Sequence, residues 1–150
     1  MFIGSYNNTL DTKGRAFIPS KMRFSLGERI MLVKGIDDCL YIFTTSAWEE
    51  YTKKYIENRS MADKDSRKLA RFFLGNSKEC EIDKQGRINF PADHLLYAEI
   101  DKDIVFVGCG DLIEVWDKNK YDKEMSSSNL NPDELMQAAE HNPQTDNDGV

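Results

Sequence analysis

The stretch LDTKGRAFIP, residues 10–19, recurs as IDKQGRINFP at residues 82–91, displaced by 72 positions. Both copies fit the pattern D-x-x-G-R-x-x-x-P. The likeness continues downstream at a displacement of 73, where two further pairs align: LVKG (32–35) with VFVG (105–108), and LYIF (40–43) with IEVW (113–116). So many matched positions in register indicate that one small unit occurs twice in the chain.

Each copy is expected to begin with a tight hairpin turn between two short strands. An Asp side chain bonds the backbone two residues on, and Gly supplies the positive φ of such turns, which assigns turn-forming roles to Asp11, Gly14, Asp83 and Gly86. A proline follows each turn, at a position where a first helical turn tolerates the missing N–H. Short helices are therefore expected after Pro19 and Pro91, followed by strands at 29–34, 39–43, 103–107 and 112–116.

Helices are expected between and after the two copies. Apolar residues recur every three to four positions over 46–58 and 63–74, and shorter helices are expected at 118–125 and 132–141, separated by a Ser-rich linker at 126–129. One face of the 63–74 helix carries a basic row: Lys64, Arg67, Lys68 and Arg71. This row is either a solvated helix face or an auxiliary contact to nucleic acid or an acidic partner.

A unit of about 45 residues is too small to bury an adequate core alone. We therefore expect the two copies to pair about a pseudo-twofold axis and to share one β-rich core. That arrangement would bring the two Asp-x-x-Gly-Arg turns close together on one edge of the molecule.

The charge is unevenly distributed. The chain has 26 acidic and 20 basic residues, a formal charge of −6. Residues 124–150 hold six of the acidic residues and no Lys or Arg, so positions 1–123 carry 20 of each sign. Residues 11–34 have a local excess of basic side chains. The net charge of the whole chain therefore does not exclude a polyanionic partner.

Several classes of protein find no support in the sequence. The three cysteines are isolated and the two histidines lie far apart, without disulfide, zinc or catalytic spacing, so no metal, cofactor, small-molecule substrate or enzymatic activity is expected. The longest apolar run is Cys39–Phe43, far below the roughly 18 residues of a membrane span. No signal-peptide pattern is visible, and the cytoplasm is the expected compartment.

A hairpin turn does not need arginine, yet Arg15 and Arg87 follow the glycine in both copies. The planar guanidinium group suits phosphate oxygens or guanine O6 and N7. Lys13 and Lys84 add point charges within the turns. One interpretation is that each arginine pairs with the aspartate of its own turn and stiffens it. The other is that the two clustered turns contact double-stranded DNA.

These motifs, with FLGNSKEC at 73–80 and IEVWD at 113–117, resemble the MraZ family of bacterial transcriptional regulators over roughly residues 1–125. The resemblance implies an α+β fold, a β-rich pseudo-twofold swapped-hairpin (AbrB-like) barrel. The implied divisions are an AbrB-like repeat at 5–47, a helical connector at 48–76, a second repeat at 77–120, and a helical, then disordered, acidic tail at 121–150.

The resemblance also implies a cytoplasmic, nucleoid-associated protein that assembles into rings. Such a protein binds repeated promoter boxes of the division and cell-wall gene cluster. By position, the DNA-binding residues are Lys13, Arg15, Lys84 and Arg87, with Arg23 as a weaker candidate. The first turn is expected to bind more strongly, because the second has Gln85 in place of Lys13 and more acidic surroundings. The alternative is an antitoxin-like module whose tail, residues 126–150, wraps a protein partner and which binds DNA only for autoregulation.

Overall fold

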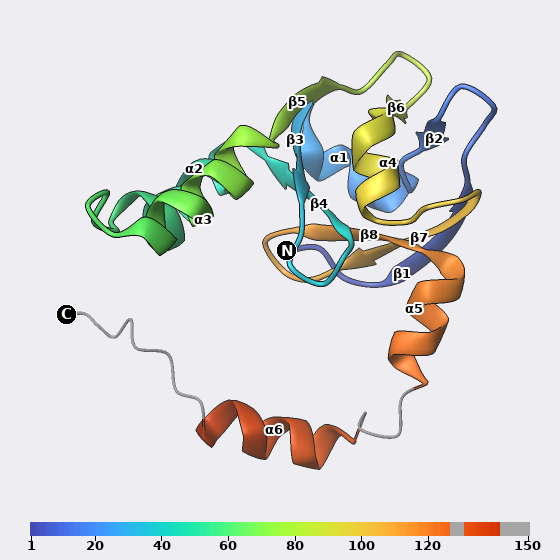
Figure 1. The fold of residues 1–150 in the computed structure, drawn as a ribbon. Helices are drawn as coiled ribbons and strands as arrows, with labels where there is room; N and C mark the ends of the chain where they lie inside the picture. Colours follow the sequence, from blue (N-terminus) through green and yellow to red (C-terminus); the bar gives the residue numbers. More distant parts are fainter. Residues whose placement is uncertain (127–130, 142–150) are drawn as a thin grey trace. The chain divides into compact units, whose positions relative to one another are not determined.

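The computed structural model describes residues 1–126 and 131–141 (Figure 1). The chain divides into a compact unit, Met1–Lys118, and a second unit, Asn119–Val150. The expected linker at 126–129 and the end of the tail lie largely outside the described residues. No helix among the described residues is long and apolar enough to cross a membrane.

An antiparallel sheet of six strands, in the order β1-β7-β8-β4-β3-β5, dominates the first unit, and β2 and β6 form a separate pair. The strands of the first repeat are β1 (Ser5–Thr9), β2 (Arg15–Phe17), β3 (Arg29–Lys34) and β4 (Leu40–Thr44). Those of the second are β5 (Lys78–Glu81), β6 (Arg87–Asn89), β7 (Asp103–Gly108) and β8 (Ile113–Asp117).

The strand order shows the expected pseudo-twofold relation. If each strand is replaced by its counterpart in the other repeat, the order becomes β5-β3-β4-β8-β7-β1. This is the same order read from the opposite edge of the sheet. The central pair is β4 with β8, where Leu40 lies opposite Val115 and Ile42 opposite Ile113. Each repeat also places its first strand against the third strand of the other repeat. The expected α+β, pseudo-twofold fold with exchanged strands is confirmed.

The expectation of simple hairpins is wrong in one respect. Both turns form, but the strands that flank each turn do not pair with each other: β1 pairs with β7, and β2 pairs with β6. In the β2–β6 pair, Ala16 faces Ile88, and both side chains are buried. A local hairpin within one repeat would leave these apolar side chains without a covering surface, whereas pairing between the repeats buries both.

The sequence alignment of the third strands is also off by one residue. Thr9 and Glu81 are equivalent at a displacement of 72, and they lie opposite Asp103 and Arg29 respectively. Asp103 is thus the counterpart of Arg29, at a displacement of 74. By the same displacement Leu32 corresponds to Phe106, and both are fully buried in the core. The glycine that ends both LVKG (32–35) and VFVG (105–108) hid a longer link before β7. This link shifts the equivalence, and the shorter turn before β8 shifts it back by one residue.

The helices match the expected segments. Those that follow the two prolines are α1 (Ser20–Leu26) and α4 (Ala92–Tyr97); the connector holds α2 (Thr45–Thr52) and α3 (Lys64–Gly75). The last two are α5 (Lys118–Met125) and α6 (Pro132–His141). One feature was not expected: α2 continues as a π-helical segment, η1, at Lys53–Glu57.

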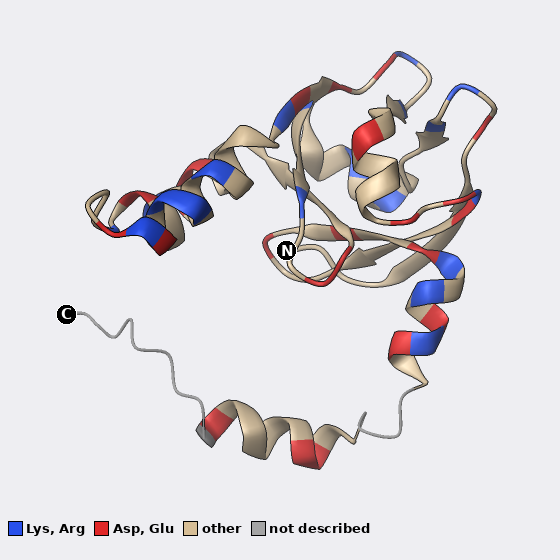
Figure 2. Cartoon of the chain, in the orientation of Figure 1, with Lys and Arg blue, Asp and Glu red and all other residues tan. Residues whose placement is uncertain are grey.

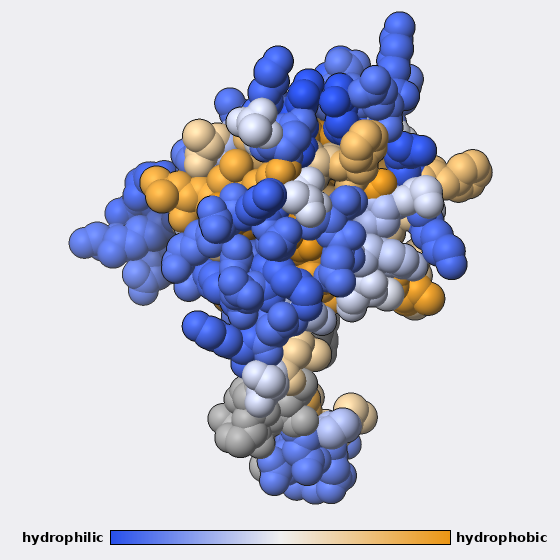
Figure 3. Space-filling view, turned by 90° about the vertical axis from the view of Figure 1, so that its right-hand side faces the viewer, coloured by the Kyte–Doolittle hydropathy of each residue, from blue (hydrophilic) through white to orange (hydrophobic). Residues whose placement is uncertain are grey.

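Two apolar clusters hold the first unit together. The core lies between the six-stranded sheet, α1, α4 and the β2–β6 pair, and its fully buried members include Ile30, Leu32, Ile88 and Phe106. A second, aromatic cluster joins β4 to the connector helices through contacts of Phe43 with Trp48 and Tyr51. The surface seen in Figure 3 is largely hydrophilic, with separate hydrophobic patches.

We predict that Ile88→Ala lowers the free energy of unfolding by about 2–4 kcal/mol, because the fully buried side chain leaves a cavity between the repeats. Leu96→Ala is the control, since Leu96 is 80% exposed and its loss should cost about 0.5 kcal/mol or less. Urea unfolding followed by tryptophan fluorescence measures both. Equal losses for the two variants would contradict the assignment of the shared core.

Candidate nucleic-acid interface

The first arginine turn, residues 11–15, is closed by its own backbone and by one aspartate. The N–H of Gly14 donates to the carbonyl of Asp11 at 3.0 Å, and the N–H of Asp11 donates to the carbonyl of Arg15 at 2.8 Å. Oδ1 of Asp11 accepts from the backbone N–H groups of Lys13 and Arg15, both at 2.9 Å. Its other oxygen, Oδ2, accepts from Nε of Arg15 at 2.8 Å.

The second arginine turn, residues 83–87, repeats this geometry. Oδ1 of Asp83 accepts from the N–H groups of Gln85 at 2.9 Å and Arg87 at 2.8 Å, and Oδ2 accepts from Nε of Arg87 at 2.8 Å. The glycine in each turn has a left-handed backbone, with φ of 78° at Gly14 and 89° at Gly86. Glycine adopts this conformation without the steric cost that a side chain would add.

The two turns are bonded together through the strands that follow them. The N–H of Ile18 donates to the carbonyl of Gly86, and the N–H of Phe90 donates to the carbonyl of Gly14, both at 2.9 Å. These bonds continue the β2–β6 pairing into both turns. The expectation that the two turns lie close together is confirmed, and Figures 1 and 2 show the two loops rising side by side with basic residues at their tips.

Both interpretations of the turn arginines are compatible with this geometry. Each guanidinium group uses Nε to bond the aspartate of its own turn. Within the described part of the chain, the terminal Nη groups of Arg15 and Arg87 donate no hydrogen bond to protein. The side chains are 30% and 22% exposed. The aspartate thus fixes the plane of the guanidinium group, and the edge of that group that carries the two Nη atoms remains available to a ligand.

The aspartates are held in their ionised form. The backbone N–H of Arg15, with that arginine's side chain, keeps the pKa of Asp11 below the ordinary value of 3.8. The backbone N–H of Arg87 and its guanidinium group do the same for the pKa of Asp83. Each turn therefore keeps its anchoring carboxylate charged at neutral pH.

The remaining candidate residues are placed unequally. Lys13 and Lys84 are exposed within their own turns. Arg23 follows the first turn in sequence, but its Nη1 donates to the carbonyl of Gln85 at 3.2 Å, so in space it belongs to the second turn. Phe17 was not among the residues expected from the sequence. It is 49% exposed, and its ring centroid lies 5.9 Å from Cζ of the Arg87 guanidinium group. A large aromatic side chain next to the turn was the only signal for it.

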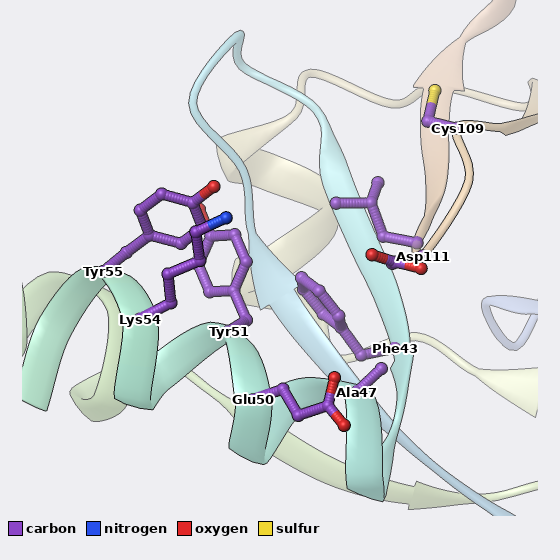
Figure 4. A pocket seen from close by; sticks show the side chains of 9 residues that line it. Phe43, Ala47, Glu50, Tyr51, Lys54, Tyr55, Cys109 and Asp111 are labelled. Carbon is purple, nitrogen blue, oxygen red and sulfur yellow. The ribbon is translucent and has the colours of Figure 1, made fainter. Parts of the chain in front are cut away.

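A separate hollow of about 350 Å³ lies between α2, η1 and the β7–β8 turn, away from the arginine turns (Figure 4). Its walls combine aromatic rings with the charged groups of Glu50, Lys54 and Asp111. Burial and the nearby Glu114 raise the pKa of Cys109 to about 11, which leaves its thiol protonated and weakly nucleophilic. No group of three metal-binding side chains occurs among the described residues.

We predict that Asp11 and Asp83 titrate below pH 3.8. A lowered pKa in the folded state means that each carboxylate stabilises the fold above its unfolded pKa, and that this contribution is lost as the pH falls through the folded pKa. NMR titration of the amides of Lys13 and Gln85 reports the two sites. In Asp11→Asn, the acid-induced shift of Lys13 should vanish while that of Gln85 remains. Midpoints at or above pH 3.8 would contradict the anchoring role.

The chain matches a protein-family model described as "MraZ protein, putative antitoxin-like" twice, over residues 1–72 and 73–144. The boundary between the matches agrees with the 72-residue displacement of the repeat. The chain is also similar to proteins named "Transcriptional regulator MraZ" in three bacteria. The relative from Alkaliphilus oremlandii (strain OhILAs) is 42% identical over 90% of this chain and 94% of its own length.

The relative from Thermoanaerobacter sp. (strain X514) is 39% identical over 94% of this chain and 96% of its own length. The relative from Acetivibrio thermocellus (strain ATCC 27405) is 38% identical over 91% of this chain and 95% of its own length. The two family-model matches together span most of the chain and agree with the repeated arginine turn. The relatives are similar over nearly their full length. The chain belongs to the MraZ family.

Proposed function

We propose that this chain is a transcriptional regulator that binds double-stranded DNA in a sequence-specific manner through its two arginine turns. The observation that carries the proposal is the bonded pair of turns, each with an ionised aspartate that orients an arginine through Nε, while the Nη groups of that arginine donate no hydrogen bond to the described part of the protein. An oriented guanidinium group donates two parallel hydrogen bonds to a guanine edge or to a phosphate.

Lys13 and Lys84 fit the phosphate backbone, because a flexible ammonium group acts as a point charge and carries no base specificity. One copy of the chain would make few such contacts and bind weakly. Several copies joined in a ring would bind repeated promoter boxes more strongly, because each bound copy raises the effective concentration of the next. The proposed targets are the boxes of the division and cell-wall gene cluster, with the protein in the cytoplasm and on the nucleoid.

Arg15→Ala should weaken binding to a duplex taken from upstream of the protein's own gene by about tenfold or more, because it removes an oriented guanidinium group at the interface. Fluorescence anisotropy at fixed salt measures the affinity, and circular dichroism checks the fold. Lys68→Ala is the charge-matched control, since Lys68 is exposed on α3 in the basic row.

Unchanged affinity in folded Arg15→Ala would refute a DNA contact at the first turn. A loss in Lys68→Ala as large as that in Arg15→Ala would instead assign the contact to the basic row of α3. That row also has an internal role, because Nη1 of Arg67 donates to the carbonyl groups of Met61 and Ala62, both at 3.0 Å.

The alternative function, an antitoxin-like module, draws on the wording of the family description. It requires the C-terminal segment to wrap a protein partner. Helix α6 offers Leu135 and Met136, which are 49% and 65% exposed, as apolar anchors. This is a small apolar surface for a protein ligand. Recovery of a stoichiometric protein partner that is lost on removal of residues 124–150 would favour this alternative.

The acidic segment 124–150 should reduce non-specific DNA binding, because its six carboxylates repel phosphate and the segment contains no Lys or Arg. A chain truncated to residues 1–123 should therefore bind random duplex DNA more tightly than the full chain at about 50 mM salt, with the difference shrinking as salt is added. Equal affinities at low salt would count against this role.

A further inference from the structure

The two arginine turns differ in what the opposite repeat places against them. The side chain of Arg23, from α1 of the first repeat, reaches the second arginine turn and donates to the carbonyl of Gln85. The equivalent position in α4, displaced by 72 residues, is Leu95. Leu95 lies against the first turn, where its Cδ1 would be 3.7 Å from a Cβ built on Gly14. The second turn therefore has a cationic brace where the first has an aliphatic contact.

Gly86 shows how closely this brace fits. A Cβ built on Gly86 would lie 1.4 Å from Nη1 of Arg23 and 2.6 Å from its Cζ, so the guanidinium group crosses the glycine backbone directly. At Gly14 the nearest atom to such a Cβ is the carbonyl oxygen of Phe90 at 3.5 Å, an ordinary contact. Both glycines need their left-handed backbone, but only Gly86 must also leave room for a side chain of the other repeat.

We propose that Arg23 is a positioning residue that holds the second arginine turn in the shape in which Arg87 faces the DNA. The expected effect of this residue on DNA affinity rests on the proposed function. A turn that is braced before binding loses less conformational freedom when the complex forms. The second turn thus has a contact that orders it in advance and that the first turn lacks, so one chain presents two unlike DNA-binding turns despite its repeated sequence.

This role differs from a simple phosphate contact. A residue that only contacts phosphate contributes independently of Arg87, and lysine replaces it well. A residue that acts through the second turn loses its effect when Arg87 is absent. Lysine then replaces it poorly, because an ammonium group lacks the planar fork that lies across Gly86.

The first experiment needs no DNA. Hydrogen exchange of the Gln85 and Gly86 amides is measured by NMR in Arg23→Leu, which carries the residue of the equivalent position in the second repeat. Lys21→Leu, which removes the same charge from an exposed site on the same helix, is the control. We expect at least fivefold faster exchange in Arg23→Leu and no change in Lys21→Leu. Unchanged exchange in folded Arg23→Leu would overturn the proposal.

The second experiment measures affinity for the duplex used above. We expect Arg23→Leu and Arg23→Lys each to weaken binding by about fivefold or more, and the effect of Arg23→Leu to fall below about twofold in an Arg87→Ala background. If the losses of affinity from Arg23→Leu and Arg87→Ala multiply in the double variant, and Arg23→Lys binds as the wild type does, the positioning role is overturned in favour of a direct phosphate contact. If the wild-type chain binds no duplex while the amides of Arg23→Leu exchange faster, the brace stands and the proposed function fails.

Discussion

The pairing of β2 with β6 is the contact on which the rest of the structure depends. Ala16 and Ile88 face each other there and are buried, and neither repeat could cover its own apolar strand. The same pairing extends into the turns, where the carbonyl of each turn glycine accepts from the opposite repeat. Burial of the core and the placement of the two arginine turns therefore have a common cause.

Within each turn, one carboxylate performs two tasks. Its first oxygen satisfies two backbone N–H groups and shapes the turn, while its second bonds Nε and orients the guanidinium group. An ion pair at the surface contributes little to stability by itself. Its value here lies in geometry, since the guanidinium edge that would meet DNA is not the edge bound to Asp. Pairing with the turn aspartate and recognition of a ligand are therefore compatible roles for one arginine.

The pseudo-twofold relation is close in the backbone and incomplete in the side chains. The registers of the central strands obey it, and the carboxylate geometry is nearly identical in the two turns. Arg23 and Leu95 break it at the helices, and Phe17 and Asn89 break it at the strands beneath the turns. A duplicated unit can thus keep one fold while its two copies acquire different surfaces, because surface substitutions cost little stability when the shared core is preserved.

The sequence determined the repeat, the helix after each proline, the strand segments and the composition of both turns, because these follow from local spacing and from residues that only a few backbone shapes accept. The tertiary structure alone decided which strands pair, that Leu32 corresponds to Phe106, and that Arg23 serves the second turn. These features depend on burial and on contacts between residues that lie from 46 positions apart (Leu32 and Lys78) to 102 positions apart (Ser5 and Val107) in the sequence. No local pattern records such distances, since the exchange of strands is favoured by the shared core rather than by either repeat.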